Sequence, residues 1–147
     1  MKTYVLTVSE KFPATHKRAG EETNFVGLIG MQKKIHTIRG NYDLWKKRFE
    51  KIEFGEAVLS VRVWTGKPYN SLQEEIHCLG SIDEIGIQKV EFDDWLYTCL
   101  IDGKRVSFSS ERIAENDGLT QSDFEEWFKN SLTPEPKAII HFTKFRY

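Results

Sequence analysis

A short segment in the first third of the chain carries an unusual density of reactive side chains. Residues 33–39 contain two lysines, a histidine, a threonine and an arginine, but only two apolar residues. A strand that buries one face should not carry so many charges unless one side faces water or a ligand. Strand alternation places Thr37 and Arg39 on one face and Lys34 on the other, so a bulge is needed to bring Lys34 beside Thr37. We therefore expect a polar pocket around Lys34, Thr37 and Arg39; if none forms, the two cations are solvated strand residues.

A second group of candidate residues lies on a loop rich in glycine and proline, residues 64–71. Trp64, Lys67 and Tyr69 are of the types that stack on a base and contact a phosphate. The alternative is that Trp64 and Tyr69 are core residues that close one end of the fold. We expect these three residues at the rim of the pocket.

Two further basic clusters have both a functional and a structural interpretation. Lys46, Lys47, Arg48 and Lys51 fall on one predicted helix, while residues 83–94 and 111–126 are acidic. Such a bipolar molecule can bind a phosphate backbone, although a charged helix face is more often simply solvated. His16 lies in a polar stretch, residues 10–23, which could fold over the pocket.

Length and composition restrict the class of protein. A chain of 147 residues fits one domain, residues 1–147. A net charge of -1 does not suit a protein that coats nucleic acid non-specifically. No apolar run approaches the roughly 20 residues of a membrane span, and the N-terminus lacks the pattern of a signal peptide. Two cysteines and four scattered histidines show no zinc-site spacing. We expect a cytoplasmic monomer without a metal or cofactor.

The pattern of the whole chain predicts more strands than helices. The Asp102-Gly103 pair predicts a tight hairpin turn, Gly118 a helix end, and Asn24 and Thr120 helix N-caps. The expected strands are 4–8, 33–39, 57–64, 73–79, 82–90, 96–101, 104–108 and 137–145, and the expected helices are 24–29, 43–52, 110–118 and 121–129. Strands and helices do not alternate regularly, which favours an α+β fold: a mixed β-barrel of six to seven strands with short helices closing its ends.

Three sequence elements together resemble a known family. They are Lys34-Ile35-His36-Thr37-Ile38-Arg39, then Gly55-Glu56-Ala57-Val58-Leu59, and finally Asp117-Gly118-Leu119 followed by Asp123-Phe124. In this order they resemble the ASCH domain of the PUA-like superfamily, from about residue 24 to the end of the chain. The resemblance implies a PUA-like barrel and a cleft beside it that binds RNA or a nucleotide.

More distantly, the chain resembles bacterial acetylcytidine amidohydrolases, which use a lysine, a threonine and a glutamate. That resemblance implies catalytic roles for Lys34 and Thr37, with the carboxylate position falling on or near Asp117 and Glu115 two residues earlier. Thr37 would be the nucleophile, and Lys34 its base if burial or Arg39 lowers the pKa of Lys34. The carboxylate would carry a proton to the leaving amine.

These observations predict three functions of different classes. The first is binding of RNA or a nucleoside-type ligand by Lys34, Thr37 and Arg39, with the loop residues at the rim. The second is hydrolysis of an acylated nucleoside. The third is a protein-interaction module that uses a tryptophan-rich surface and takes no small ligand.

Overall fold

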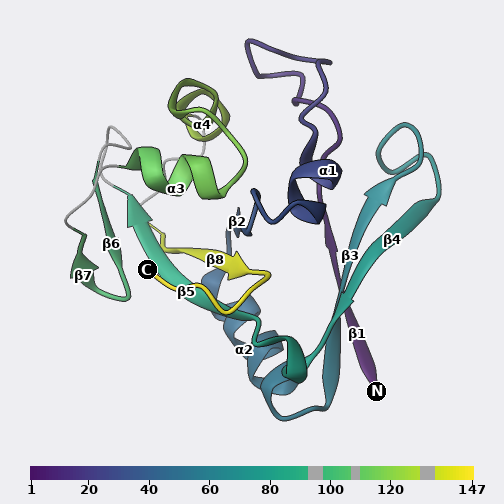
Figure 1. Cartoon of the computed structure of the whole chain (residues 1–147), viewed down its shortest axis with the longest axis vertical. Coiled ribbons are helices and arrows are strands. Elements are labelled where there is room, and N and C mark those ends of the chain that lie inside the picture. Colours follow the sequence, from purple (N-terminus) through teal and green to yellow (C-terminus); the bar gives the residue numbers. More distant parts are fainter. Residues whose placement is uncertain (93–97, 107–109, 130–134) are drawn as a thin grey trace.

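The computed structural model describes residues 1–92, 98–106, 110–129 and 135–147. Within these ranges the strands form two sheets, and the helices lie around them (Figure 1). The smaller sheet has the order β1-β3-β4, with β1 (Lys2–Thr7) parallel to β3 (Ala57–Trp64) and β4 (Gln73–Leu79) antiparallel to it. A register shift between Val61 and Arg62 interrupts the β3–β4 pairing.

The larger sheet has five antiparallel strands in the order β2-β8-β5-β6-β7. These are β2 (His36–Arg39), β8 (Lys137–His141), β5 (Gly86–Phe92), β6 (Cys99–Ile101) and β7 (Lys104–Arg105). Asp102 and Gly103 both have positive φ angles between β6 and β7, as the predicted hairpin turn requires. The β2–β8 register places Thr37 opposite Ile140 and His36 opposite His141.

The helices cover the sheets and close the spaces between them. They are α1 (Phe25–Gly30), α2 (Tyr42–Glu53), α3 (Ser110–Asn116) and α4 (Gln121–Phe128), with one 3₁₀ turn, η1 (Ser81–Asp83). The α2 helix buries Trp45, Phe49 and Ile52 and contacts β3, β5 and β8. The α3 and α4 helices pack against each other.

The core consists of two apolar clusters, and β8 contributes to both. Ala138 and Ile140 belong to the cluster beneath α2 and the smaller sheet, whereas Ile139 belongs to the cluster beneath α3 and α4. All three side chains are fully buried. Because successive side chains of a strand point to opposite faces, β8 forms a common wall between the two halves of the molecule.

The α+β class is confirmed, but the expected closed barrel is not formed by the strand pairing of the described residues. Their strands form two open sheets, where a single barrel was expected. Strand β1 is an edge strand of the separate small sheet, where it pairs in parallel with β3. Within the described ranges β1 pairs with no strand of the larger sheet. Residues 96–97 and 107–108 of the expected hairpin lie outside the described residues.

Several element boundaries also differ from the sequence-based expectation, and the last strand ends at His141 rather than at residue 145. The strand expected from residue 33 begins only at His36, because the amides of Lys33 and Lys34 both donate to the Leu28 carbonyl and close α1. The strand expected from residue 82 begins at Gly86, after η1. Asn24 makes no side-chain cap; the Thr23 hydroxyl instead accepts from the amide of Phe25. None of the described helices has the length and apolarity to cross a membrane.

Candidate functional site

A cavity of about 290 Å³ lies between α1, β2, α4 and the C-terminal end of β1. Its polar lining includes Lys34, Thr37, Arg39 and Asp117, residues that the sequence analysis had singled out. Its other walls are mostly apolar or aromatic: Val8, Pro13, Phe25, Ile38, Leu119, Trp127 and Phe128. A few convergent polar groups within an apolar enclosure are typical of a small-molecule site.

Lys34 reaches the cavity through a tight turn rather than through a strand bulge. Gln32 adopts a positive φ angle, and the chain then turns so that the amides of Lys33 and Lys34 close the C-terminal end of α1. The lysine therefore precedes β2 and its side chain points inward. Gly118 lies directly against it, since a Cβ atom on Gly118 would fall 3.1 Å from the Cβ of Lys34.

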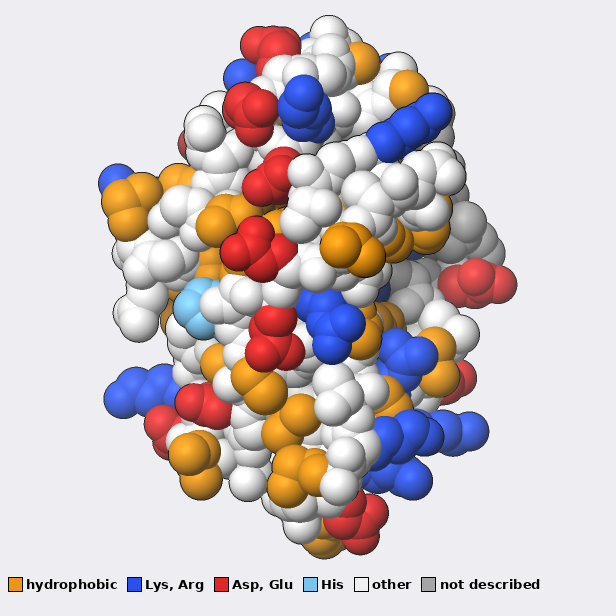
Figure 2. Space-filling model, turned by 90° about the vertical axis from the view of Figure 1, so that its right-hand side faces the viewer, with side chains coloured by type: hydrophobic (Ala, Val, Ile, Leu, Met, Phe, Trp, Pro, Cys, Tyr) orange, Lys and Arg blue, Asp and Glu red, His pale blue; other side chains and the backbone are white. Residues whose placement is uncertain are grey.

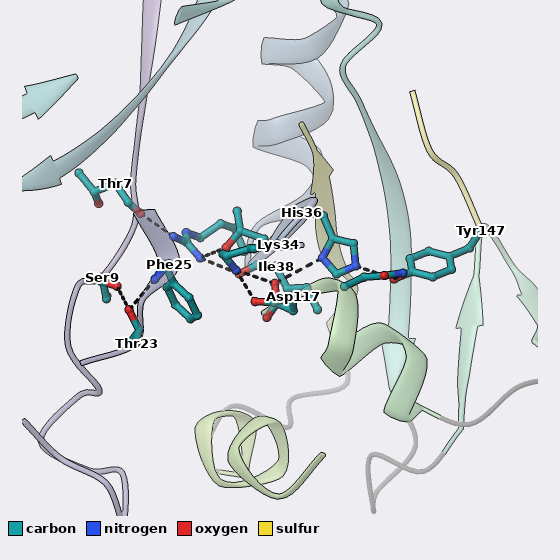
Figure 3. Close-up of polar contacts among 12 residues, drawn as sticks. Thr7, Ser9, Thr23, Phe25, Lys34, His36, Ile38, Asp117 and Tyr147 are labelled. Atoms are coloured by element: carbon teal, nitrogen blue, oxygen red, sulfur yellow. Dashed lines mark hydrogen bonds and ion pairs between the residues drawn. The ribbon is translucent and has the colours of Figure 1, made fainter. Parts of the chain in front are cut away.

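Lys34 and Asp117 form a buried ion pair at the centre of the site (Figure 3). The Nζ atom of Lys34 donates to the carbonyl oxygen of Asp117 at 2.6 Å and to its Oδ1 at 3.1 Å. The two side chains are only 1% and 5% exposed. The ammonium also lies 4.2 Å from the centre of the Phe25 ring. These contacts satisfy a charge that could not otherwise be buried.

Burial and the charge of the partner both act on the pKa values of Lys34 and Asp117. Burial lowers the pKa of Lys34, and the Asp117 carboxylate opposes this by favouring the ammonium. Burial alone would raise the pKa of Asp117, but the charge of Lys34 and the hydrogen bond from His36 outweigh it and hold the pKa below its usual range. Asp117 is therefore ionised at neutral pH.

Arg39 and Thr37 form the second polar group of the cavity. One guanidinium nitrogen, Nη1, donates to the Thr37 hydroxyl at 2.8 Å, while Nη2 donates to the carbonyl of Thr7 at 2.6 Å. Burial lowers the pKa of Arg39, but a guanidinium stays charged at any physiological pH. Because the Thr37 oxygen accepts from Arg39, its own proton is available to a ligand acceptor.

The structure does not bring the other predicted residues to this cavity. Glu115 is exposed on α3 and is not among the lining residues, so the position of the predicted carboxylate is taken by Asp117 alone. Trp64, Lys67 and Tyr69 lie at the β3–β4 turn and do not line the cavity. The rings of Trp64 and Tyr69 are 5.2 Å apart, and Tyr69 is 87% exposed, which does not match a core plug.

His16 holds the 10–23 loop in place. Its Nδ1 accepts from the amide of Arg18 at 2.9 Å, so its Nε2 carries the proton and donates to the Asp123 carbonyl at 3.0 Å. One ring nitrogen therefore attaches the loop to α4, and the other stabilises a turn within the loop. Pro13 of this loop lines the cavity.

Two residues of the site were not foreseen. In the sequence His36 is only one member of a polar segment and nothing marks Tyr147, yet His36 is hydrogen-bonded to Asp117 and Tyr147 to His36. No local sequence pattern connects positions 36, 117 and 147, and only the tertiary fold brings them together.

No family model, curated protein or solved structure matches this chain. Its function must therefore be argued from the geometry of the cavity. Among the residues described, no group of three or more histidine, cysteine or acidic side chains is placed to hold a metal ion.

Proposed function

We propose that the cavity binds a nucleoside-type ligand, either free or as an exposed nucleoside of single-stranded RNA. The observation that carries this proposal is the meeting of Lys34, Thr37, Arg39 and Asp117 in one cavity whose remaining walls are mostly apolar. Such a cavity offers donors, one ionised acceptor and aromatic surfaces within a small volume. A nucleobase needs just these groups, because it is read by hydrogen bonds along its edge and by stacking on its face.

The size of the cavity supports one nucleoside rather than a longer ligand. A volume of about 290 Å³ is at the lower limit of ligand pockets. Phe25 and Trp127 supply ring surfaces, and their ring centres are 5.7 Å apart. We also propose the relationship to ASCH domains, which rests on the Lys34 to Arg39 element and on Asp117.

Calorimetric titration with cytidine, uridine, adenosine, guanosine and acetylcytidine tests the proposal. At least one should bind saturably with one site per chain. Thr37→Val, which replaces the hydroxyl with a methyl group of similar size, should weaken that binding about tenfold through a lost hydrogen bond. Thr3→Val, at an exposed position of β1, is the matched control and should leave affinity unchanged. The absence of binding by every nucleoside and by short single-stranded RNA would exclude this function.

A second candidate is hydrolysis of an acylated nucleoside, which is favoured by Asp117 lining the same cavity as Thr37. The Thr37 oxygen would add to the acyl carbon, assisted by the adjacent Arg39 cation, and its proton would pass to Asp117. The C–N bond would then break as Asp117 returns that proton to the amine, and water would release the acid from threonine. In this scheme Lys34 holds Asp117 and is not the base, because its ammonium donates two hydrogen bonds to that residue.

Turnover distinguishes the two candidates. A hydrolase releases acetate and cytidine from acetylcytidine, and Thr37→Val and Asp117→Asn both abolish the release. Binding without turnover in the wild-type protein would leave the first function and exclude the second.

A further inference from the structure

A chain of hydrogen bonds runs from the Asp117 carboxylate away from the cavity. Oδ1 of Asp117 is 3.3 Å from Nδ1 of His36, and Nε2 of His36 is 2.5 Å from the Tyr147 hydroxyl. The Asn116 side-chain amide in turn donates to that hydroxyl at 3.0 Å. Figure 3 shows Lys34, Asp117, His36 and Tyr147 in one row. His36 is fully buried.

The chemistry of the groups fixes the direction of each hydrogen bond. An ionised carboxylate only accepts, so the proton of His36 must be on Nδ1. Burial lowers the pKa of His36, which keeps the ring neutral and leaves Nε2 as an acceptor. The Tyr147 hydroxyl therefore donates to Nε2, and burial raises its pKa so that it keeps this proton. One tautomer of His36 satisfies the whole chain.

Tyr147 is held in this position by the larger sheet. The side-chain oxygen of Gln88 in β5 accepts from the backbone amide of Tyr147 at 2.8 Å, and its nitrogen donates to the Tyr147 carbonyl at 3.2 Å. The same Gln88 oxygen is 3.0 Å from Nε2 of His141. The segment after β8 is thereby attached to β5 at both backbone groups of Tyr147.

The contacts of Asp117 are concentrated on one oxygen. Among the described residues, the Oδ1 atom receives the side-chain hydrogen bonds of both Lys34 and His36, and Oδ2 receives none. A carboxylate held through Oδ1 presents Oδ2 in a fixed orientation. Since Asp117 lines the cavity, Oδ2 is the acceptor available for an N–H group of a ligand.

We propose that His36 and Tyr147 are positioning residues that orient the Asp117 carboxylate for its ligand, and that Tyr147 does so by fixing the orientation of the His36 ring. This inference rests on the proposed nucleoside-binding function. Without the Tyr147 hydroxyl, Nε2 of His36 becomes a buried acceptor without its donor. The ring then loses its second anchor, its Nδ1–H bond to Asp117 weakens, and the carboxylate is held mainly by Lys34.

The test is Tyr147→Phe, which removes only the hydroxyl, compared with Phe145→Leu, which loosens the same segment and keeps the hydroxyl. Nitrogen NMR of the His36 ring, without ligand, should show the Nδ1–H tautomer in the wild type and in Phe145→Leu. In Tyr147→Phe the ring should remain the Nδ1–H tautomer, but its Nδ1 proton should move upfield and exchange faster with water, because the hydrogen bond to Asp117 is weaker. Calorimetry should show about tenfold weaker nucleoside binding for Tyr147→Phe and unchanged binding for Phe145→Leu.

An Nδ1–H signal in Tyr147→Phe that matches the wild type overturns the proposal, and so does a changed signal with unchanged affinity. Equal losses of affinity in the two variants would also overturn it, because a general loosening would then explain both. If the wild type binds no nucleoside, the proposed function fails, while the Nδ1–H signal still reports whether Tyr147 positions the residue that holds Asp117.

Discussion

Lys34 is the residue on which the site depends most. Its ammonium is enclosed by the Asp117 carbonyl and carboxylate and by the Phe25 ring. A buried ion pair adds little net stability compared with a well-packed apolar pair, but removing one partner leaves the other charge buried and uncompensated. The two residues should therefore behave as a unit.

Replacing Lys34 with methionine should lower the free energy of unfolding by about 3–5 kcal/mol, because Asp117 would lose its main counter-charge. Lys33→Met, at the exposed neighbouring position, should change it by less than about 0.5 kcal/mol. Urea unfolding measures both. If Lys34→Met costs no more than Lys33→Met, the ion pair does not hold the site together.

Two buried histidines make stability depend on pH. Burial lowers the pKa of His36, and burial, together with the neighbouring His36 and Arg146, lowers the pKa of His141 to about 2. In the unfolded chain a histidine titrates near pH 6.5, so below that pH the unfolded state binds protons that the folded state does not. Asp117, whose pKa is also lowered, contributes stability that is lost only at more acidic pH.

Stability should therefore fall on acidification from about pH 6 to 4, by about 1.4 kcal/mol per pH unit for each histidine that stays neutral. His141→Asn should reduce this slope by the amount that one neutral buried histidine contributes. His77→Asn, at an exposed position of β4, should not. Urea unfolding at a series of pH values gives the slopes, and an equal slope in wild type and His141→Asn would contradict the assignment.

At this scale the local sequence pattern predicts the cations and the hydroxyl of the site, and the resemblance points to Asp117, but neither predicts His36 or Tyr147. Lys34, Thr37 and Arg39 stand out because too many polar residues share one short segment. The role of His36 depends on Asp117 and Tyr147, which are 81 and 111 residues away. Polar residues this far apart give no periodic signal, so only the fold reveals that they meet.

Among the elements, the turn that ends α3 controls the approach of Asp117 to Lys34. Gly118 has a φ angle of +80°, and a Cβ atom there would lie 3.1 Å from the Cβ of Lys34 and 3.3 Å from Cδ1 of Leu28. Gly20 has a similar φ angle of +83° with no atom within 4 Å of such a Cβ. Alanine at position 20 would therefore meet only the strain of the backbone conformation, whereas alanine at position 118 would also press against Lys34.

Gly20→Ala should destabilise the protein by about 1–2 kcal/mol, the cost of a left-handed conformation for alanine. Gly118→Ala should cost clearly more and should also weaken ligand binding, because it displaces Lys34. Urea unfolding and calorimetry measure the two effects. Equal destabilisation by the two substitutions would show that the close approach of residues 118 and 34 is unimportant.

The 10–23 loop and α4 form the wall of the cavity farthest from the sheets. Arg18 in the loop pairs with Asp123 of α4 at 2.6 Å and with Glu21 of the same loop at 3.3 Å. The loop supplies Pro13 to the cavity, and α4 supplies Trp127. The Arg18–Asp123 pair therefore connects two walls of the site.

Asp123→Asn should let the loop detach more often, so that trypsin cleaves after Lys17 or Arg18 faster than in the wild type. Glu21→Gln removes the contact within the loop and keeps the one to α4, so it should leave the cleavage rate close to that of the wild type. A time course followed by mass spectrometry distinguishes the variants. Equal rates for all three proteins would mean that the pair does not hold the loop.

The sequence predicts the elements themselves better than it predicts their ends. The α2 helix follows its apolar spacing, and the Thr120 hydroxyl caps α4 by accepting from the amide of Asp123. The start of β2 was misplaced because alternation cannot reveal that the amides before it serve α1. Whether the sheets close into a barrel depends on which strand edges meet, and local patterns do not encode that.

At the scale of the whole molecule, the surface is not that of a general nucleic-acid-binding protein. The chain has a net charge of -1, and Figure 2 shows acidic, basic and hydrophobic side chains interspersed over the face on view. On α2, Arg48 lies over the rings of Tyr4 and Trp45, so part of the predicted basic face packs on aromatic residues. Specific binding is therefore expected from the cavity.

The third predicted function, a tryptophan-rich interaction surface, has little support in the described residues. Trp45 is buried, whereas Trp64 and Trp127 are partly buried, and Trp95 lies outside the described residues. The largest exposed hydrophobic side chains, such as Phe54, Tyr69 and Ile82, come from different elements. Single exposed apolar residues are normal on protein surfaces.

Amide chemical-shift mapping during a nucleoside titration tests the central claim most directly, because it locates the ligand on the whole chain at once. The account predicts saturable shifts concentrated at Thr37, Arg39 and Asp117, with little change at residues 64–71. Shifts confined to that exposed loop, or no saturable shifts with any nucleoside, would contradict the assignment of this cavity as the ligand site.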